Sequence, residues 1–264
     1  ERPDPWLVAR HEREISPLLH RRALFADVRD FLLYDFFTDE GRVNEDVFAY
    51  SNRHGDERSL VVYHNRYART AGWIRESCAY RDKEGGGLRR RTLRDALGLR
   101  DDADWFVRFR DASTGLEYLR GQQELARQGF RVELEAYRCH VFLDWREVRD
   151  EGTRPWARLC AELGGRGVPS LEEALAALEL RPVHEALRAL LDPEAARALA
   201  EAAPAADTPI RAARCTTLLD EAERRAGALI EVARRVLPPA GPEGPRAWTG
   251  DARAAAGVLR RRLE

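Results

Sequence analysis

Residues 130–137 read Phe-Arg-Val-Glu-Leu-Glu-Ala-Tyr, and this stretch decides the fold class because its apolar and charged residues alternate. From Phe130 to Ala136 every second residue is apolar, and each position between them carries arginine or glutamate. Successive side chains of a β-strand point to opposite faces of a sheet, so this alternation is typical of a strand with one face buried and one face in water. We therefore predict a half-buried strand whose four apolar residues face the core.

Other short strand-like runs surround this stretch. Residues 46–53 and 59–65 are rich in apolar and aromatic residues, and a turn-forming cluster, His-Gly-Asp-Glu, separates them. Two such runs around a Gly-Asp turn predict an antiparallel hairpin. Residues 31–37 and 139–145 are also apolar and predict two more strands. The fold class that we expect is therefore α+β, with an antiparallel β-sandwich over residues 31–148.

A segment from about residue 81 to residue 127 separates these strands, and we interpret it as an insertion in the sandwich. It contains a glycine break at residues 85–87 and a stretch, residues 92–99, that predicts a short helix. Thr92 is a typical helix cap, and Asp95 falls in the first turn, where a carboxylate interacts favourably with the helix dipole.

The first 30 residues have a helical pattern instead. Ile15, Leu18 and Leu19 fall on one face of a helix that we expect to begin near Ser16, with Pro17 in the tolerated first turn. One helix of this length cannot bury its apolar face alone. Because the chain also contains no methionine, we interpret it as part of a longer protein and expect this helix to pack on the missing part.

Residues 149–264 are alanine-rich and predict an α-helical domain. One helix is expected to begin with the capping box at Ser170 and to end before Pro182, since proline disrupts a helix interior. A long helix is expected from Pro209. Residues 238–263 predict a proline-rich linker and a weak last helix.

The composition excludes several classes of protein. There are 44 basic and 45 acidic residues, with a formal net charge of −1, whereas a nucleic-acid-binding protein usually has a basic excess. The four cysteines show no CxxC spacing, so we expect neither a zinc framework nor a disulfide scaffold but reduced thiols, as in the cytoplasm. No apolar run approaches the roughly 20 residues of a membrane span, so no membrane partner is expected.

The order of these pieces resembles the C-terminal region of an α-amylase superfamily glycoside hydrolase. In that family a (β/α)₈ barrel ends with a helix of the LLxRR kind and passes directly into an antiparallel sandwich, domain C. Residues 11–22, which read HEREISPLLHRR, resemble that last barrel helix. Residues 47–53 and 60–66 resemble the first strands of domain C, and residues 132–143 resemble its closing strands. The resemblance covers about the first half of the chain.

This resemblance implies three parts: residues 1–30 as the terminal helix of a barrel, residues 31–148 as the sandwich, and residues 149–264 as an appended helical domain. It implies a non-catalytic C-terminal region of an enzyme acting on α-glucans, which stabilises or shields the catalytic barrel, its partner. The family's three catalytic carboxylates lie on barrel strands, and no position here matches their motifs, so we assign no catalytic residue. The resemblance leaves the substrate open, and also whether the parent hydrolyses or transfers sugar.

Two other classes of function remain open. The first alternative is a free-standing carbohydrate-binding sandwich fused to a helical interaction module. The second is a purely structural or partner-binding protein that uses its amphipathic helices as an interface.

Aromatic rings can pack on the apolar face of a sugar ring, so tryptophan and tyrosine are the candidate binding residues. Trp73, Trp105 and Tyr118 lie on or beside the predicted insertion, and we take them as candidate carbohydrate-binding residues. The alternative for each is burial in the core, which we expect of Trp145 and Trp156.

Two histidines, His64 and His140, are residues of the type that takes part in acid–base or metal chemistry. Asn65 follows His64, and His140 lies four residues before Asp144, but one histidine with one aspartate does not specify a site and neither has HExxH spacing. We interpret both as hydrogen-bonded strand histidines, and we assign no metal ligand and no cofactor.

Overall fold

The computed structural model describes residues 2–26, 28, 30–82, 85–202 and 209–236. The chain divides into two compact units, Glu1–Leu175 and Ala176–Glu264, which are described separately. In these described ranges, each helix is too short or too polar to span a lipid bilayer.

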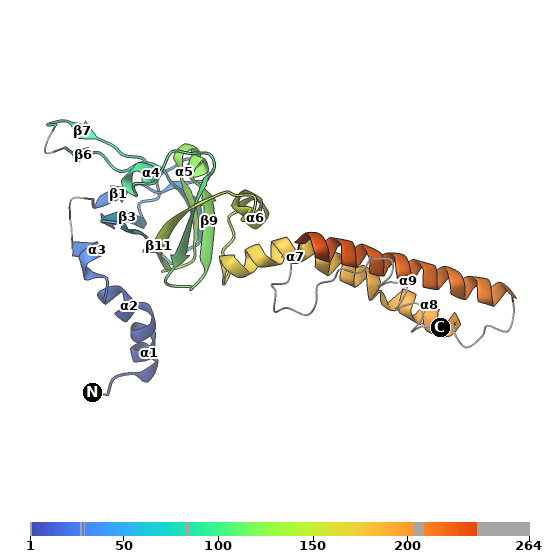
Figure 1. Ribbon diagram of the computed structural model, residues 1–264. Helices are drawn as coiled ribbons and strands as arrows, with labels where there is room; N and C mark the ends of the chain where they lie inside the picture. Colours follow the sequence, from blue (N-terminus) through green and yellow to red (C-terminus); the bar gives the residue numbers. More distant parts are fainter. Residues whose placement is uncertain (1, 27, 29, 83–84, 203–208, 237–264) are drawn as a thin grey trace. The chain divides into compact units, whose positions relative to one another are not determined.

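The first unit contains two main antiparallel sheets (Figure 1). The six-stranded sheet has the order β1 (Leu32–Tyr34), β3 (Val47–His54), β4 (Glu57–His64), β11 (Cys139–Arg149), β8 (Trp105–Asp111) and β9 (Glu117–Gly121). The three-stranded sheet has the order β10 (Phe130–Leu134), β5 (Thr70–Ile74) and β2 (Phe37–Thr38), and β6 (Tyr80–Arg81) pairs with β7 (Leu88–Arg89). The α+β fold with antiparallel sheets followed by helices is thus confirmed.

The strand that decided the fold class is β10, and its side chains alternate between buried and exposed as predicted. It ends at Leu134, three residues before the end of the alternating stretch. The predicted hairpin is also confirmed, because β3 pairs with β4 over eight residues. Gly55 lies in its turn with φ 58°, a left-handed conformation that glycine adopts without strain.

One hydrophobic core joins the two sheets. Leu60, Val107 and Phe142 contribute from the six-stranded sheet, and Ile74 and Phe130 contribute from the three-stranded sheet. The core positions predicted for two tryptophans are confirmed, since Trp145 and Trp156 are both almost fully buried.

The segment interpreted as an insertion contains two strands of the large sheet, β8 and β9. It contains α4 (Leu93–Ala96), capped by Thr92 as predicted, and then β8 and β9, followed by α5 (Gln122–Gln128). β8 pairs with β11 over most of its length. Residues 105–121 therefore belong to the large sheet rather than to a loop outside it.

Three short helices precede the sheets: α1 (Pro5–Glu14), α2 (Ser16–Leu19) and α3 (Arg22–Ala26). A helix begins at Ser16 as predicted, but it ends at Leu19. Residues 11–22 are divided among α1, α2 and the start of α3 and do not form the single helix that was expected. α3 attaches to the large sheet, because Leu24 is fully buried in a small cluster with Val61 and Leu143.

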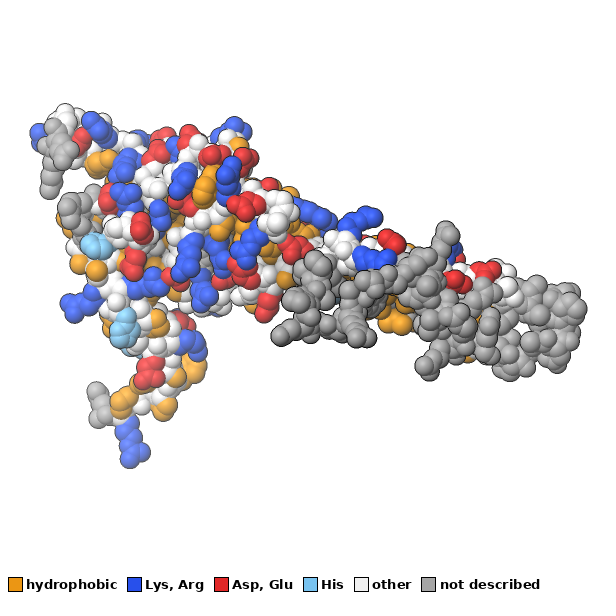
Figure 2. All heavy atoms as spheres, viewed as in Figure 1, with side chains coloured by type: hydrophobic (Ala, Val, Ile, Leu, Met, Phe, Trp, Pro, Cys, Tyr) orange, Lys and Arg blue, Asp and Glu red, His pale blue; other side chains and the backbone are white. Residues whose placement is uncertain are grey.

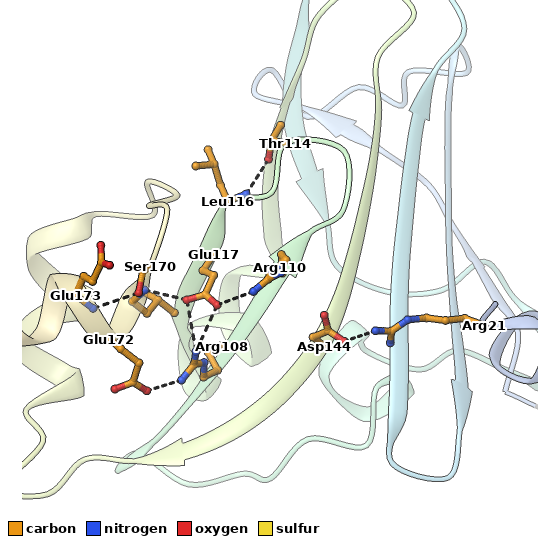
Figure 3. Close-up of polar contacts among 11 residues, drawn as sticks. Arg21, Arg108, Arg110, Thr114, Leu116, Glu117, Asp144, Ser170, Glu172 and Glu173 are labelled. Atoms are coloured by element: carbon orange, nitrogen blue, oxygen red, sulfur yellow. Dashed lines mark hydrogen bonds and ion pairs between the residues drawn. The ribbon is translucent and has the colours of Figure 1, made fainter. Parts of the chain in front are cut away.

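A bulge in β11 makes a second attachment for the N-terminal helices. The pairing between β11 and β8 shifts register between Leu143 and Arg146, and Asp144 within the bulge has φ 58°. A bulge redirects the side chains that it contains. The carboxylate of Asp144 lies 2.6 Å from Nη2 of Arg21, just before α3 (Figure 3).

A carboxylate on β9 connects the large sheet to the helices that follow, α6 (Trp156–Leu163) and α7 (Leu171–Leu190). Glu117 accepts a hydrogen bond of 2.8 Å from the backbone N–H of Leu171 and pairs with Arg108 and Arg110 (Figure 3). Burial alone would raise the pKa of Glu117, but the Leu171 N–H and the two guanidinium groups hold it below its usual value.

Replacing Glu117 with glutamine is expected to lower the free energy of unfolding by about 1.5–3 kcal/mol, the usual contribution of hydrogen bonds to a charged group. Urea unfolding followed by tryptophan fluorescence measures this loss. Glu57→Gln, at an exposed position on β4, is the matched control and should change stability by less than about 0.5 kcal/mol. Equal losses in both variants would contradict a specific role for Glu117.

One helix boundary predicted from the sequence is wrong. α7 continues through Pro182 to Leu190, although proline removes a backbone donor. Burial of apolar residues such as Leu178 on this helix offsets the lost hydrogen bond.

The second unit also contains α8 (Pro193–Ala202) and α9 (Pro209–Val236), which pack on each other. Arg225 of α9 donates a hydrogen bond of 2.8 Å to the carbonyl of Ala189 in α7. The start of the predicted long helix at Pro209 is confirmed, whereas the linker and last helix predicted over residues 238–263 lie outside the described residues.

Candidate functional site

The structure brings together two of the three aromatic residues that were predicted to bind sugar. Trp73 and Tyr118 line one cavity of about 510 Å³ in the first unit. Trp105 lies elsewhere on β8, half-buried, with the guanidinium carbon of Arg100 4.2 Å from the centre of its ring.

The glycine-rich turn after α6 forms one wall of this cavity, which we call the β9–β10 cavity. Gly164 has φ 53° and ends α6 in the left-handed conformation that is common for a glycine just after a helix. Val168 exchanges two backbone hydrogen bonds with Glu117, so the turn lies along β9, the edge strand of the large sheet. A side chain at Gly167 would collide with the ring of Tyr118, because its Cβ would lie 2.6 Å from Tyr118 Cζ.

The opposite wall is the three-stranded sheet. Trp73 on β5 is paired in register with Arg131 on β10, and both line the β9–β10 cavity. The indole N–H of Trp73 donates to a carboxylate oxygen of Asp39 at 3.2 Å, which restrains the ring. Trp73 is half-buried and is thus a wall residue rather than a core residue.

Tyr118 is more constrained than a simple stacking surface. Its ring is parallel to that of Phe109, with 5.6 Å between centroids, and lies edge-on to Phe142. Burial raises the pKa of the Tyr118 hydroxyl. One face of the ring is already covered, so a ligand in the cavity meets only the remaining part of the side chain.

Sequence reasoning missed the most unusual residue of the cavity, Arg120. Its side chain is 9% exposed, and it donates to the carbonyls of Leu119 at 2.9 Å and Gly165 at 2.7 Å. Among the residues that the structure describes, no carboxylate lies within 4.0 Å of its guanidinium group. Burial lowers the pKa of Arg120. Arginine is the most common basic residue in this chain, so nothing in the sequence distinguished this one.

His140 also lines the β9–β10 cavity, and its acidic partner is not the one nearest in sequence. Nδ1 of His140 lies 2.8 Å from Oδ2 of Asp111, whereas Asp144 pairs with Arg21. Asp111 is fully buried and also accepts hydrogen bonds from the hydroxyls of Ser113 and Thr114. Both histidines are hydrogen-bonded strand residues, as predicted: Nδ1 of His64 lies 3.3 Å from the carbonyl oxygen of Glu135.

The His140–Asp111 pair has a defined proton arrangement. Burial alone would raise the pKa of Asp111, but the His140 ring and the hydroxyls of Ser113 and Thr114 hold it below its usual value. An ionised carboxylate only accepts hydrogen bonds, so Nδ1 of His140 carries the hydrogen. The other ring nitrogen, Nε2, is then an acceptor whenever the ring is neutral.

The β9–β10 cavity therefore holds groups suited to binding: a buried cation, an oriented imidazole and an indole. In the described part of the chain, no three His, Cys, Asp or Glu side chains are placed to hold a metal ion. No protein-family model matches this chain, and no curated protein matches it either. The function is therefore inferred from the residues themselves.

Proposed function

We propose that this chain is the non-catalytic C-terminal region of an α-amylase-like enzyme that acts on α-glucans, and that it stabilises or shields the catalytic barrel. The order of short helices, antiparallel sheets and further helices supports this proposal, because it is the order expected from the family resemblance. The two sheets would correspond to the sandwich of domain C.

The observation that carries the proposal is the apolar surface of the N-terminal helices. Trp6 is 65% exposed and Leu19 is 57% exposed, and Leu7 and Ile15 are exposed as well. Figure 2 shows apolar side chains gathered on this segment, whereas charged side chains are interspersed over the sheets. Contiguous apolar surface of this kind usually marks a contact with another protein surface.

The anchoring of this segment supports a barrel as the partner. Leu24 and the Arg21–Asp144 ion pair attach the end of the segment to the large sheet, so the exposed helices lead directly into the sheets. The last helix of a barrel would have this arrangement, with one side on the barrel and its end on domain C.

The coding sequence that precedes Glu1 tests the proposal directly. A (β/α)₈ barrel with three catalytic carboxylates in that sequence is the expected result. A start codon close to Glu1, or an unrelated preceding domain, would remove the proposal.

Replacing Leu19 with aspartate is expected to weaken packing on the barrel by about 1.5–3 kcal/mol, the contribution of one buried leucine. In the enzyme that includes the barrel, a thermal melt should show a lower Tm. In the isolated chain the same variant should change the free energy of unfolding by less than about 0.5 kcal/mol, because Leu19 is exposed there. Leu88→Asp, at an exposed position on β7, is the matched control. It should lower neither the Tm of the enzyme nor the free energy of unfolding of the isolated chain.

A free-standing carbohydrate-binding sandwich is the second candidate function. The specific observation in its favour is that Trp73 and Tyr118 line the same cavity. Titration with maltooligosaccharides, monitored by tryptophan fluorescence, tests it. An unchanged signal at millimolar sugar would rule it out.

A further inference from the structure

We propose that the β9–β10 cavity binds a sugar that carries an anionic group, with the anion on Arg120 and the sugar ring beside Trp73. This inference goes beyond the proposed role next to a barrel and does not depend on it. It assigns a ligand class to a cavity that lies entirely within the first unit.

The charge of Arg120 indicates an anionic ligand. A guanidinium group has five N–H donors in a planar fork, and the carbonyls of Leu119 and Gly165 accept from two of its nitrogen atoms. A buried cation without a counter-ion at ion-pair distance is unfavourable, because burial removes its hydration and no close negative charge replaces it. Carboxylates and phosphates match the guanidinium fork with two oxygen atoms and would neutralise this charge.

Among the described residues, the other charged side chains that line the cavity form no ion pair with Arg120. Arg131 pairs with Asp39 at 3.0 Å and with Glu133 at 2.5 Å, so these three charges act on one another. Glu124 also lines the cavity, and its negative charge favours the charged form of Arg120, but it is exposed and its carboxylate lies beyond ion-pair distance of Arg120 within the described residues. Arg166 adds another positive charge to the lining. A negative ligand is therefore favoured over a neutral or positive one.

The remaining groups favour a hydroxylated ring as the body of the ligand. When the His140 ring is neutral, its Nε2 can accept a hydrogen bond from a hydroxyl, because Nδ1 donates to Asp111. The indole of Trp73 offers a flat apolar wall for a pyranose face. The volume of about 510 Å³ lies within the usual range for small-molecule sites.

The anion could be a phosphate ester or a carboxylate, since both present paired oxygen atoms to the guanidinium group. Isothermal titration of the wild-type chain with glucose 6-phosphate, glucuronate, glucose and inorganic phosphate distinguishes these sources. At least one charged sugar is expected to bind about tenfold more tightly than glucose and than inorganic phosphate, and its binding should weaken as salt is added. Equal affinity for glucose, or no binding of either charged sugar at millimolar concentration, would overturn the proposal.

Variants locate the ligand within the cavity. Arg120→Leu is expected to abolish the preference for the charged sugar, whereas Arg127→Leu, on α5 and outside this cavity, should retain it. Unchanged binding of the charged sugar by Arg120→Leu would contradict the site.

Arg120 also holds the turn at Gly165, so a second variant covers the case in which Arg120→Leu does not fold. Trp73→Ala should weaken binding of the charged sugar about tenfold and leave the affinity for inorganic phosphate unchanged. Wild-type affinity of Trp73→Ala for the charged sugar would overturn the placement of the sugar ring. Circular dichroism confirms that each variant is folded before its affinity is compared.

Discussion

Replacing Phe109 with alanine is expected to destabilise the first unit by about 3–5 kcal/mol, the usual loss for a buried phenylalanine. Phe109 lies on β8 and is 2% exposed. Its ring stacks on Trp145 with 4.2 Å between centroids and lies edge-on to Phe130 and Phe142. The alanine variant would leave a cavity among aromatic rings that belong to both sheets, and these cannot all move inward to fill it.

Urea unfolding followed by tryptophan fluorescence measures this loss, because Trp145 contacts the substituted residue. Phe48→Ala is the matched control: Phe48 lies on β3 in the same sheet, but it is 53% exposed. Its substitution should lower the free energy of unfolding by less than about 1 kcal/mol. A similar shift of the urea unfolding midpoint in both variants would show that Phe109 contributes no more to stability than an exposed phenylalanine does.

Replacing Asp111 with alanine is expected to lower the free energy of unfolding by about 3–5 kcal/mol, because several hydrogen bonds to a charged group, each contributing about 1.5–3 kcal/mol, are lost together. The Asp111 carboxylate accepts hydrogen bonds from His140, from the hydroxyls of Ser113 and Thr114, and from the backbone N–H of Val141 at 3.2 Å. Alanine would leave the N–H of buried Val141 and the half-buried ring of His140 without this acceptor, whereas the exposed hydroxyls of Ser113 and Thr114 can bond to water. The loop between β8 and β9 would lose its anchor on β11.

Glu57→Ala, the removal of an exposed carboxylate on β4, is the control for this variant and should stay within about 0.5 kcal/mol of the wild type. The pH dependence provides a further check. The folded pKa of Asp111 lies below its unfolded value of about 3.9, so its contribution to stability is complete above that value. This contribution is lost as the pH falls through the folded pKa, and Asp111→Ala should therefore lose less stability than the wild type over that acidic range. Parallel losses in both proteins would contradict the assigned role.

Features of the fold that depend on neighbouring residues could be predicted from the sequence. The alternation in residues 130–134, the hairpin around Gly55 and the helix end at Gly164 all follow from local rules of backbone geometry and side-chain direction. The core positions of Trp145 and Trp156 also follow, because large apolar residues within regular periodic patterns are usually buried. The candidate sugar-binding residues follow from residue type and from their place on or beside the predicted insertion, and two of the three line one cavity.

Features that depend on distant residues could not be predicted. The partner of His140 lies 29 positions away, at Asp111, whereas the nearer Asp144 is taken by Arg21 from the N-terminal helices. Arg120 is buried because the turn at Gly165, 45 positions later in the chain, packs against it and accepts one of its hydrogen bonds.

Periodicity and turn chemistry act over a few residues, so the amino-acid pattern was enough to predict the fold class and several of the strands and helix ends. Three features became evident from the folded chain alone: β8 and β9 belong to the large sheet, α7 passes through Pro182, and a buried cation lines a cavity. Strand pairing, packing and burial are contacts between segments far apart in the chain, so no local pattern specifies them.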